Sequence, residues 1–168
     1  MLQKIRWRSL LTGGFFLIID QFLKWFSLDA WTEKKIGCLG LPPHQNFWCG
    51  GWEPFANYGA AFGLPVPNRV IVILTIPALF LIGYLFAKQR PPLNLPLSKG
   101  EGIRLFALAI LFFGALSNLI DRLAYGYVVD YLRALTGIIN LSDILIVLGL
   151  LFFLFGKGIP LPTKSGSE

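Results

Sequence analysis

Four long apolar stretches constrain this chain more than any other feature. They cover approximately residues 9–28, 70–87, 103–123 and 138–155. A helix needs about 20 mostly apolar residues to cross the hydrocarbon core of a bilayer, so each stretch is long enough to span it. The composition agrees, because 55% of the residues are hydrophobic and only 14% are charged, which excludes an ordinary soluble domain. We therefore predict an all-α integral membrane protein with four transmembrane helices, forming a single membrane domain over residues 1–168.

The first stretch is predicted to be retained as a span. A cleavable signal has a short apolar region followed by small residues at the cleavage site. Here the apolar region is longer, and Asp29, Ala30 and Trp31 follow it.

The distribution of Lys and Arg predicts the orientation, because these residues are more frequent in short cytoplasmic loops. They are concentrated before the first stretch, in the second connection and after the fourth stretch (Lys4, Arg6, Arg8; Lys88, Arg90, Lys99, Arg104; Lys157, Lys164). The other two connections are charge-balanced. Both termini are therefore predicted to be cytoplasmic. The net charge of +6 is explained by this topology and by attraction to anionic membrane lipid, so no nucleic-acid partner is expected.

Three of the predicted helices carry polar residues three or four positions apart, where side chains share one helix face. The pairs are Asp20 with Lys24, Asn118 with Asp121, and Asn140 with Asp143. In the predicted orientation all three pairs lie toward the outer side of the membrane. A charge in a membrane helix costs roughly 2.5 to 3.5 kcal/mol at the centre, so such residues usually face the bundle interior and have a function. The pattern predicts a polar site near the outer surface.

The carboxylates do not all suggest the same role. Asp20 and Lys24 favour an ion pair within one helix over catalysis, and Asp121 fits a helix-end network at least as well as proton transfer. Asp143 has no basic neighbour in its helix, which favours a functional role. Asp130 lies in the connection between the last two helices, and the apolar run around it suggests an interfacial segment that returns Asp130 toward Asp143.

Two carboxylates in a partly dry site can share one proton, so that one activates water and the other donates a hydrogen bond to the scissile carbonyl. With His44 as the only histidine and no HExxH motif, a zinc site is not expected. Ser117 or Ser142 with Lys24 remains an alternative nucleophile and base. Two non-hydrolytic readings also stay open: a proton transporter, which would place polar residues at several depths, and an assembly factor that binds a partner helix.

Four sequence blocks resemble, in order, the signature blocks of bacterial lipoprotein signal peptidase, also called signal peptidase II. They are DQFLK at 20–24, NYGAAFG at 57–63, GALSNLIDRLAYGYVVDYL at 114–132 and NLSD at 140–143. The resemblance implies an aspartic endopeptidase without a cofactor that cleaves prolipoproteins before the diacylglyceryl-modified cysteine. It also implies a multi-pass protein of the bacterial plasma (inner) membrane with its active site at the outer face, and we expect a monomer.

Carried over by position, the resemblance implies Asp130 and Asp143 as the catalytic residues. It implies that Asn118, Arg122 and Asn140 order the site, that Asp20, Lys24 and Asp121 support it, and that Asn57 and Gly59 meet the substrate. The residues alone rank Asp121 beside Asp130, and the family pattern decides between them. The chain departs from that pattern at Ala56, Ser117, Ile139 and Ser142, where Arg, Gly, Phe and Ala are usual. These departures are expected to affect substrate or inhibitor contacts more than the chemistry.

Residues 29–69 form an outer loop that is longer than most structureless connections. Its aromatic residues, among them Trp31, Phe47, Trp48, Trp52 and Phe55, suggest that it lies on the bilayer surface as a small interfacial subdomain, either a lid over the site or an anchor. A disulfide between Cys38 and Cys49 is ranked slightly ahead of two free thiols.

Overall fold

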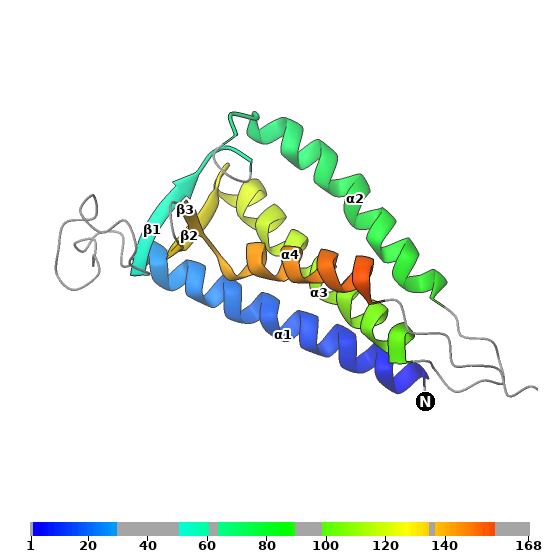
Figure 1. Cartoon of the computed structure of the whole chain (residues 1–168). Coiled ribbons are helices and arrows are strands. Elements are labelled where there is room, and N and C mark those ends of the chain that lie inside the picture. Colours follow the sequence, from blue (N-terminus) through cyan, green and yellow to red (C-terminus); the bar gives the residue numbers. More distant parts are fainter. Residues whose placement is uncertain (1, 30–50, 61–63, 90–98, 135–136, 157–168) are drawn as a thin grey trace, which may run out of the picture.

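The computed structural model describes residues 2–29, 51–60, 64–89, 99–134 and 137–156. Within these ranges it has four helices and three strands (Figure 1). The helices are α1 Leu2–Asp29, α2 Asn68–Lys88, α3 Lys99–Ala124 and α4 Leu141–Phe155. The strands are β1 Gly51–Asn57, β2 Val128–Ala134 and β3 Gly137–Ile139. Cys38, Cys49, His44 and most of the aromatic residues of the outer loop lie outside the described residues.

The four helices correspond to the four predicted apolar stretches, with shifted ends. Two of them, α2 and residues Gly100–Ala124 of α3, are long and apolar enough to cross a membrane. Helix α4 has 15 residues and begins at Leu141, three residues later than predicted. The reason is local: Asn140 has extended backbone angles and caps the helix, while the residues before it form β3. An apolar run alone cannot distinguish a short strand from the first turn of a helix.

The described residues are predominantly helical, as predicted, but they are not all-α, because three strands form an antiparallel sheet in the order β1-β2-β3. Strand β2 begins with the β-branched pair Val128 and Val129, and its third residue, Asp130, lies opposite Phe55 of β1. Gly126 makes the turn from α3 into β2 with a φ of 81°, a conformation that glycine adopts without strain. Strand β1 lies within the predicted outer loop, so part of that loop is ordered against the connection that carries Asp130.

Helix α3 lies at the centre of the helix bundle and packs against the other three helices. Two glycines allow α4 to approach it closely, as is common between membrane helices. A Cβ atom at Gly114 would lie 2.9 Å from the carbonyl oxygen of Ser142, and one at Gly149 would lie 2.9 Å from that of Ala107. These two close contacts fix the position of α4 along α3, and the contact at Gly114 lies beside the start of α4.

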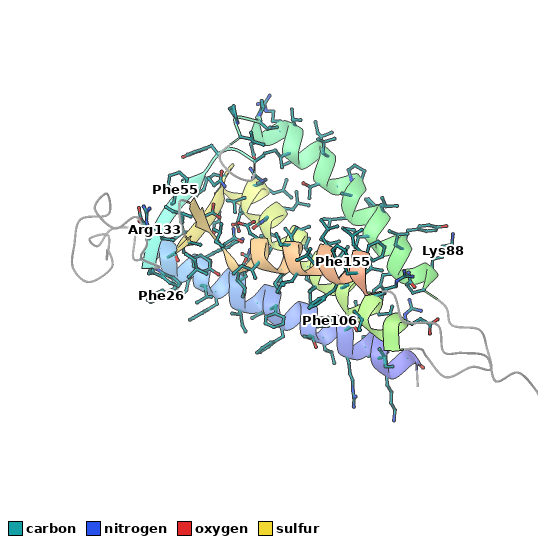
Figure 2. All side chains as sticks on the ribbon, viewed as in Figure 1. Phe26, Phe55, Lys88, Phe106, Arg133 and Phe155 are labelled. Atoms are coloured by element: carbon teal, nitrogen blue, oxygen red, sulfur yellow. The ribbon has the colours of Figure 1, made fainter. Side chains whose placement is uncertain are left out.

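The sheet lies at one end of the bundle, where α1 and α3 end and α4 begins (Figure 1). Helix α1 starts at the opposite end of the bundle, and α4 runs toward that end (Figure 1). In Figure 2, Lys88 and Phe155 lie toward that opposite end, while Phe55 and Arg133 lie beside the sheet. Helix α2 leans away from the other helices, and many of its apolar side chains are exposed, as lipid-facing side chains would be. That the end of the bundle opposite the sheet is cytoplasmic stays a prediction.

Candidate active site

The site forms around the first turn of α4, where the capping residue of the helix also contacts Asp130. The Asn140 side chain accepts a hydrogen bond from the backbone N–H of Asp143 at 2.9 Å, and the Asp143 carboxylate accepts one from the backbone N–H of Asn140 at 3.3 Å. This reciprocal pair is a capping box, which satisfies helix N–H groups that have no partner within the helix. Asn140 Nδ2 donates to Asp130 Oδ1 at 2.6 Å. Asn140 thus contacts both Asp130 and Asp143, the two residues that the resemblance implies as catalytic, hereafter the aspartate pair.

Asp130 is the third residue of β2 and is only 1% exposed. Besides Asn140, the side chain of Asn57 donates to it, from Nδ2 to Oδ2 at 3.0 Å. Burial and the nearby charge of Asp143 raise the pKa of Asp130 to about 7, although the hydrogen bonds from Asn57 and Asn140 act in the opposite direction. Asp130 can therefore hold a proton near neutral pH.

Asp143 receives its second hydrogen bond from α3. Asn118 Nδ2 donates to Asp143 Oδ1 at 2.9 Å, while Oδ2 accepts the capping bond from Asn140. Within the described part of the chain, neither member of the aspartate pair forms an ion pair. Both carboxylates are held by amide groups, which fix their positions and leave their charge uncompensated by a direct cationic partner.

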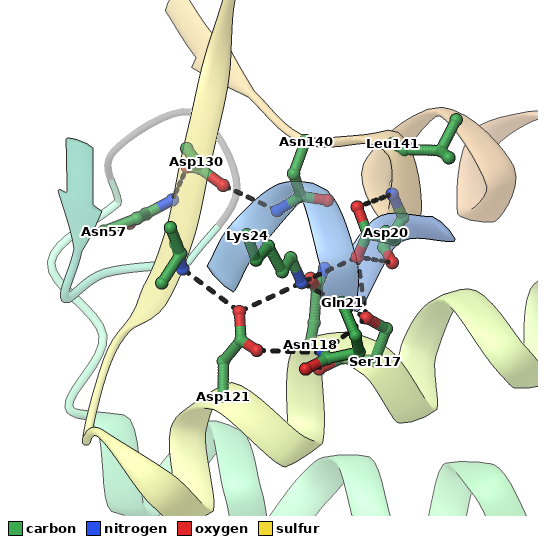
Figure 3. A network of polar contacts seen from close by, with 12 residues as sticks. Asp20, Gln21, Lys24, Asn57, Ser117, Asn118, Asp121, Asp130, Asn140 and Leu141 are labelled. Atoms are coloured by element: carbon green, nitrogen blue, oxygen red, sulfur yellow. Dashed lines mark hydrogen bonds and ion pairs between the residues drawn. The ribbon is translucent and has the colours of Figure 1, made fainter. Parts of the chain in front are cut away.

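Lys24 is 2% exposed and lies between Asp20 and Asp121 (Figure 3). Its Nζ atom is 2.9 Å from Asp20 Oδ2 and 3.0 Å from Asp121 Oδ2, so it pairs with carboxylates of two helices. It also donates to Asn118 Oδ1 at 2.9 Å, which orients the Asn118 amide so that its Nδ2 points to Asp143. Lys24 thus supports the aspartate pair through Asn118.

The surroundings of Asp121 differ from those of Asp130. Asp121 accepts hydrogen bonds from Gln21 Nε2 at 3.0 Å and from the backbone N–H of Val129 at 3.1 Å, in addition to its ion pair with Lys24. Its oxygens are occupied in joining α1, α3 and β2. This arrangement fits a structural role, and the bond to Val129 fixes the residue next to Asp130.

Arg122 connects the site to the segment after β1. Its Nη2 atom donates to the carbonyl oxygen of Gly59 at 2.7 Å, and Nη1 donates to Asn68 Oδ1 at 3.1 Å. The backbone N–H of Gly59 in turn donates to Asn57 Oδ1 at 3.1 Å. The guanidinium therefore holds the turn that presents Asn57 to Asp130.

Sequence reasoning missed three contributors to this network, namely Gln21, Asn68 and Tyr131. Gln21 could have been found, because it directly follows Asp20 on a helix that was already predicted to carry polar residues of the site. Tyr131 had no comparable signal, because an aromatic residue in a strand usually only packs. Its hydroxyl donates to Asp20 Oδ1 at 2.9 Å.

The two serines considered as nucleophiles are both fully buried. Ser117 Oγ and Ser142 Oγ each donate to Asp20 Oδ2, at 2.6 and 2.5 Å. Lys24 is engaged in two ion pairs, so it is poorly suited to act as a base. These two departures from the family pattern thus face Asp20, and their effect on substrate or inhibitor contacts stays a prediction.

The buried charged side chains in the described ranges all lie toward the sheet end of the bundle: Asp20, Lys24, Glu53, Asp121, Arg122 and Asp130. A proton relay across the membrane would need such groups at several depths. The described residues also contain no group of three His, Cys, Asp or Glu side chains that could hold a metal ion.

Comparison with known proteins identifies the family. The family model described as signal peptidase (SPase) II matches residues 13–157. The chain belongs to the signal peptidase II family. The match includes every residue of the polar network described above.

Several relatives named lipoprotein signal peptidase are similar to the chain. One from Moorella thermoacetica is 40% identical over 105 residues, which are 62% of this chain and 65% of the relative. One from Clostridium novyi is 33% identical over 156 residues, which are 86% of this chain and 95% of the relative.

Two solved structures described as bacterial membrane enzymes have the same fold. One superposes with a TM-score of 0.71 at 27% identity and covers 96% of this chain and 94% of its own. The other has a TM-score of 0.65 at 29% identity and covers 88% and 90%. The family and these structures support a bacterial membrane protein.

Proposed function

We propose that this chain is an intramembrane aspartic endopeptidase that removes signal peptides from prolipoproteins. Cleavage occurs before the diacylglyceryl-modified cysteine, and Asp130 and Asp143 are the catalytic residues. One observation supports the proposal: Asn140 hydrogen-bonds to both carboxylates, and neither carboxylate forms an ion pair within the described residues. Family membership and the names of the relatives supply the substrate class.

The chemistry follows from one proton shared between the aspartate pair. The ionised carboxylate takes a proton from water, and the hydroxide attacks the scissile carbonyl carbon. The protonated carboxyl donates a hydrogen bond to the carbonyl oxygen, and its proton passes to the leaving amine as the tetrahedral intermediate collapses. A pKa of about 7 at Asp130 suits this cycle, because Asp130 can then both release and take up a proton near neutral pH.

The other polar residues of the network have supporting roles in this proposal. Asn57 and Asn140 orient Asp130, while Asn118 orients Asp143 and is itself held by Lys24. Arg122 and Gly59 hold the segment that meets the substrate. Asp20 and Asp121 anchor the helices that carry these groups.

The location of the site fits a substrate that is itself anchored in the membrane. The aspartate pair lies where α4 begins beside the sheet, which we place at the outer face of the bacterial plasma membrane, with both termini cytoplasmic. At this level water can reach the scissile bond, while the signal helix stays in the bilayer on one side and the lipid chains hold the cysteine on the other.

The proposal is tested by incubating the purified chain in detergent with two forms of one prolipoprotein, with and without the diacylglyceryl group. Mass spectrometry of the products should show cleavage before the cysteine for the lipidated form and little for the other. Equal cleavage of both forms would refute the substrate class. No cleavage of either form by folded protein would favour the assembly-factor reading.

A further inference from the structure

The first turn of α4 has N–H groups that cannot bond within the helix, and three different residues satisfy the first three of them. Asn140 accepts from Asp143, as described above. Asp20 Oδ1 accepts from the N–H of Ser142 at 3.3 Å. The hydroxyl of Tyr131 accepts from the N–H of Leu141 at 3.1 Å. The start of α4, and with it Asp143, is thus held from α1, from β2 and by its own cap.

Tyr131 is the residue of this set whose role has no assignment. It is fully buried, directly follows Asp130 in β2, and its ring stacks on Trp52 with centroids 4.7 Å apart and planes at 29°. Its hydroxyl donates to Asp20 Oδ1 at 2.9 Å while accepting from Leu141. Burial and the neighbouring Asp20 raise the pKa of this hydroxyl, so it stays protonated and keeps both bonds.

We propose that Tyr131 is a positioning residue that fixes the first turn of α4, and therefore Asp143, relative to Asp130. This inference rests on the proposed function of the aspartate pair. Tyr131 makes no hydrogen bond to either carboxylate of the pair and acts through the N–H of Leu141 and through Asp20. Because it is the neighbour of Asp130 in the strand, it ties the backbone that carries one carboxylate to the helix that carries the other.

The loss of the hydroxyl should affect the geometry of the pair more than the fold. In Tyr131→Phe the ring and its stacking on Trp52 remain, but the buried N–H of Leu141 loses its acceptor, and such a group tends to move toward another partner. A shift of about 1 Å at reacting groups can reduce a rate by about 100-fold.

The test compares kcat and KM for a diacylglyceryl-modified prolipoprotein in detergent. We expect Tyr131→Phe to lower kcat by about tenfold, with KM changed by less than about twofold because the Tyr131 side chain is fully buried. Tyr84→Phe, on α2 and 59% exposed, is the matched control for loss of a hydroxyl and should leave both constants unchanged. Leu105→Ala controls for stability: this buried residue lies 16 positions before Asp121 on α3, about 24 Å away at about 1.5 Å per residue. It should lower the melting temperature without lowering kcat.

A second variant tests whether Tyr131 acts through Leu141. Leu141 is the first residue of α4, a position where proline is well tolerated. Asn140 before it has φ −122° and ψ 173°, which suits a residue that precedes proline. Leu141→Pro removes the N–H that Tyr131 satisfies. In the Leu141→Pro background, Tyr131→Phe should therefore lower kcat by less than about threefold.

The outcomes separate this inference from the function on which it rests. Normal cleavage by Asp143→Asn would overturn the proposed function. An inactive Asp143→Asn together with an unchanged kcat in Tyr131→Phe would overturn the positioning role alone. A tenfold loss that persists in the Leu141→Pro background would also overturn it. If Tyr131→Phe does not fold, the double variant should recover folded protein, and its failure to do so would count against the inference.

Discussion

Replacing Asn140 by alanine removes two interactions that sequence reasoning treats separately, the cap of α4 and a hydrogen bond to Asp130. The side chain accepts from the N–H of Asp143 at 2.9 Å and donates to Asp130 Oδ1 at 2.6 Å. Asn140→Ser separates the two, because serine is an equally good cap but is too short to reach Asp130. The pair of variants therefore measures each interaction.

The expected loss of stability can be built from these contacts. Loss of an N-cap costs about 1 kcal/mol, and loss of a hydrogen bond to a charged group costs about 1.5 to 3 kcal/mol. Asn140→Ala should therefore destabilise the protein by about 3 kcal/mol, which for a chain of this size lowers the melting temperature by roughly 6 to 12 °C. Asn140→Ser should recover about 1 kcal/mol of this loss.

The same change should alter the pH dependence of cleavage. The hydrogen bond from Asn140 stabilises the charged form of Asp130 and thus lowers its pKa, against the larger effect of burial. Without the bond the pKa should rise above about 7, so the alkaline decline of the pH–rate profile should move to higher pH in both variants.

Thermal unfolding of the purified protein, followed by tryptophan fluorescence, and the pH–rate profile are the two assays. Equal melting temperatures for the alanine and serine variants would show that the cap does not contribute. An unshifted alkaline limb in both would refute the proposed effect of Asn140 on Asp130.

Three further predictions concern other parts of the network. Asp130 holds its proton up to pH about 7 in the folded state but only to its ordinary value of 3.8 when unfolded, so its contribution to stability is complete below 3.8 and is lost as the pH rises through 7. The unchanged chain should therefore lose stability between pH 4 and pH 8, by at most about 4 kcal/mol, while Asp130→Asn should not lose this contribution. The melting temperature of Asp130→Asn should accordingly rise relative to that of the unchanged chain over this range, and a constant difference between the two would refute the raised pKa. Lys24→Met leaves the Asp20 and Asp121 carboxylates buried without their cation, so we expect about 3 to 5 kcal/mol of destabilisation in denaturant titrations, and a loss below 1 kcal/mol would contradict the ion pairs. Gly149→Leu should separate α4 from α3 and lower the yield of folded protein on size-exclusion chromatography, because even its Cβ would lie 2.9 Å from the α3 backbone; normal yield and melting temperature would contradict this packing.

The sequence was sufficient to predict the helices and the gathering of polar side chains toward one end of the bundle. Apolar length predicts the four helices, and three- and four-residue spacings predict which polar side chains share a face. The ion pair between Asp20 and Lys24 follows directly from such spacing, and the structure contains it.

The sheet and the contacts between elements that are distant in the sequence could not be predicted in the same way. Strand β1 pairs with β2 across more than 70 residues, and nothing local specifies that Phe55 lies opposite Asp130. Asp121 could be distinguished from Asp130 only through their surroundings, since the ion pair with Lys24 depends on how α1 packs against α3. The bonds of Tyr131 to Asp20 and Leu141 likewise join three elements whose arrangement is a property of the whole fold.

The most direct test of the central claim is the cleavage rate of the diacylglyceryl-modified prolipoprotein by three variants, Asp130→Asn, Asp143→Asn and Asp121→Asn, each confirmed to be folded and to bind substrate. The account predicts that the first two bind without cutting, with rates at least about 1,000-fold below that of the unchanged chain. It predicts that Asp121→Asn, which exchanges the same atoms in a structural carboxylate, retains measurable cleavage in its folded fraction. A normal rate in Asp130→Asn or Asp143→Asn, with complete loss in Asp121→Asn, would contradict the account and would place the chemistry at Asp121.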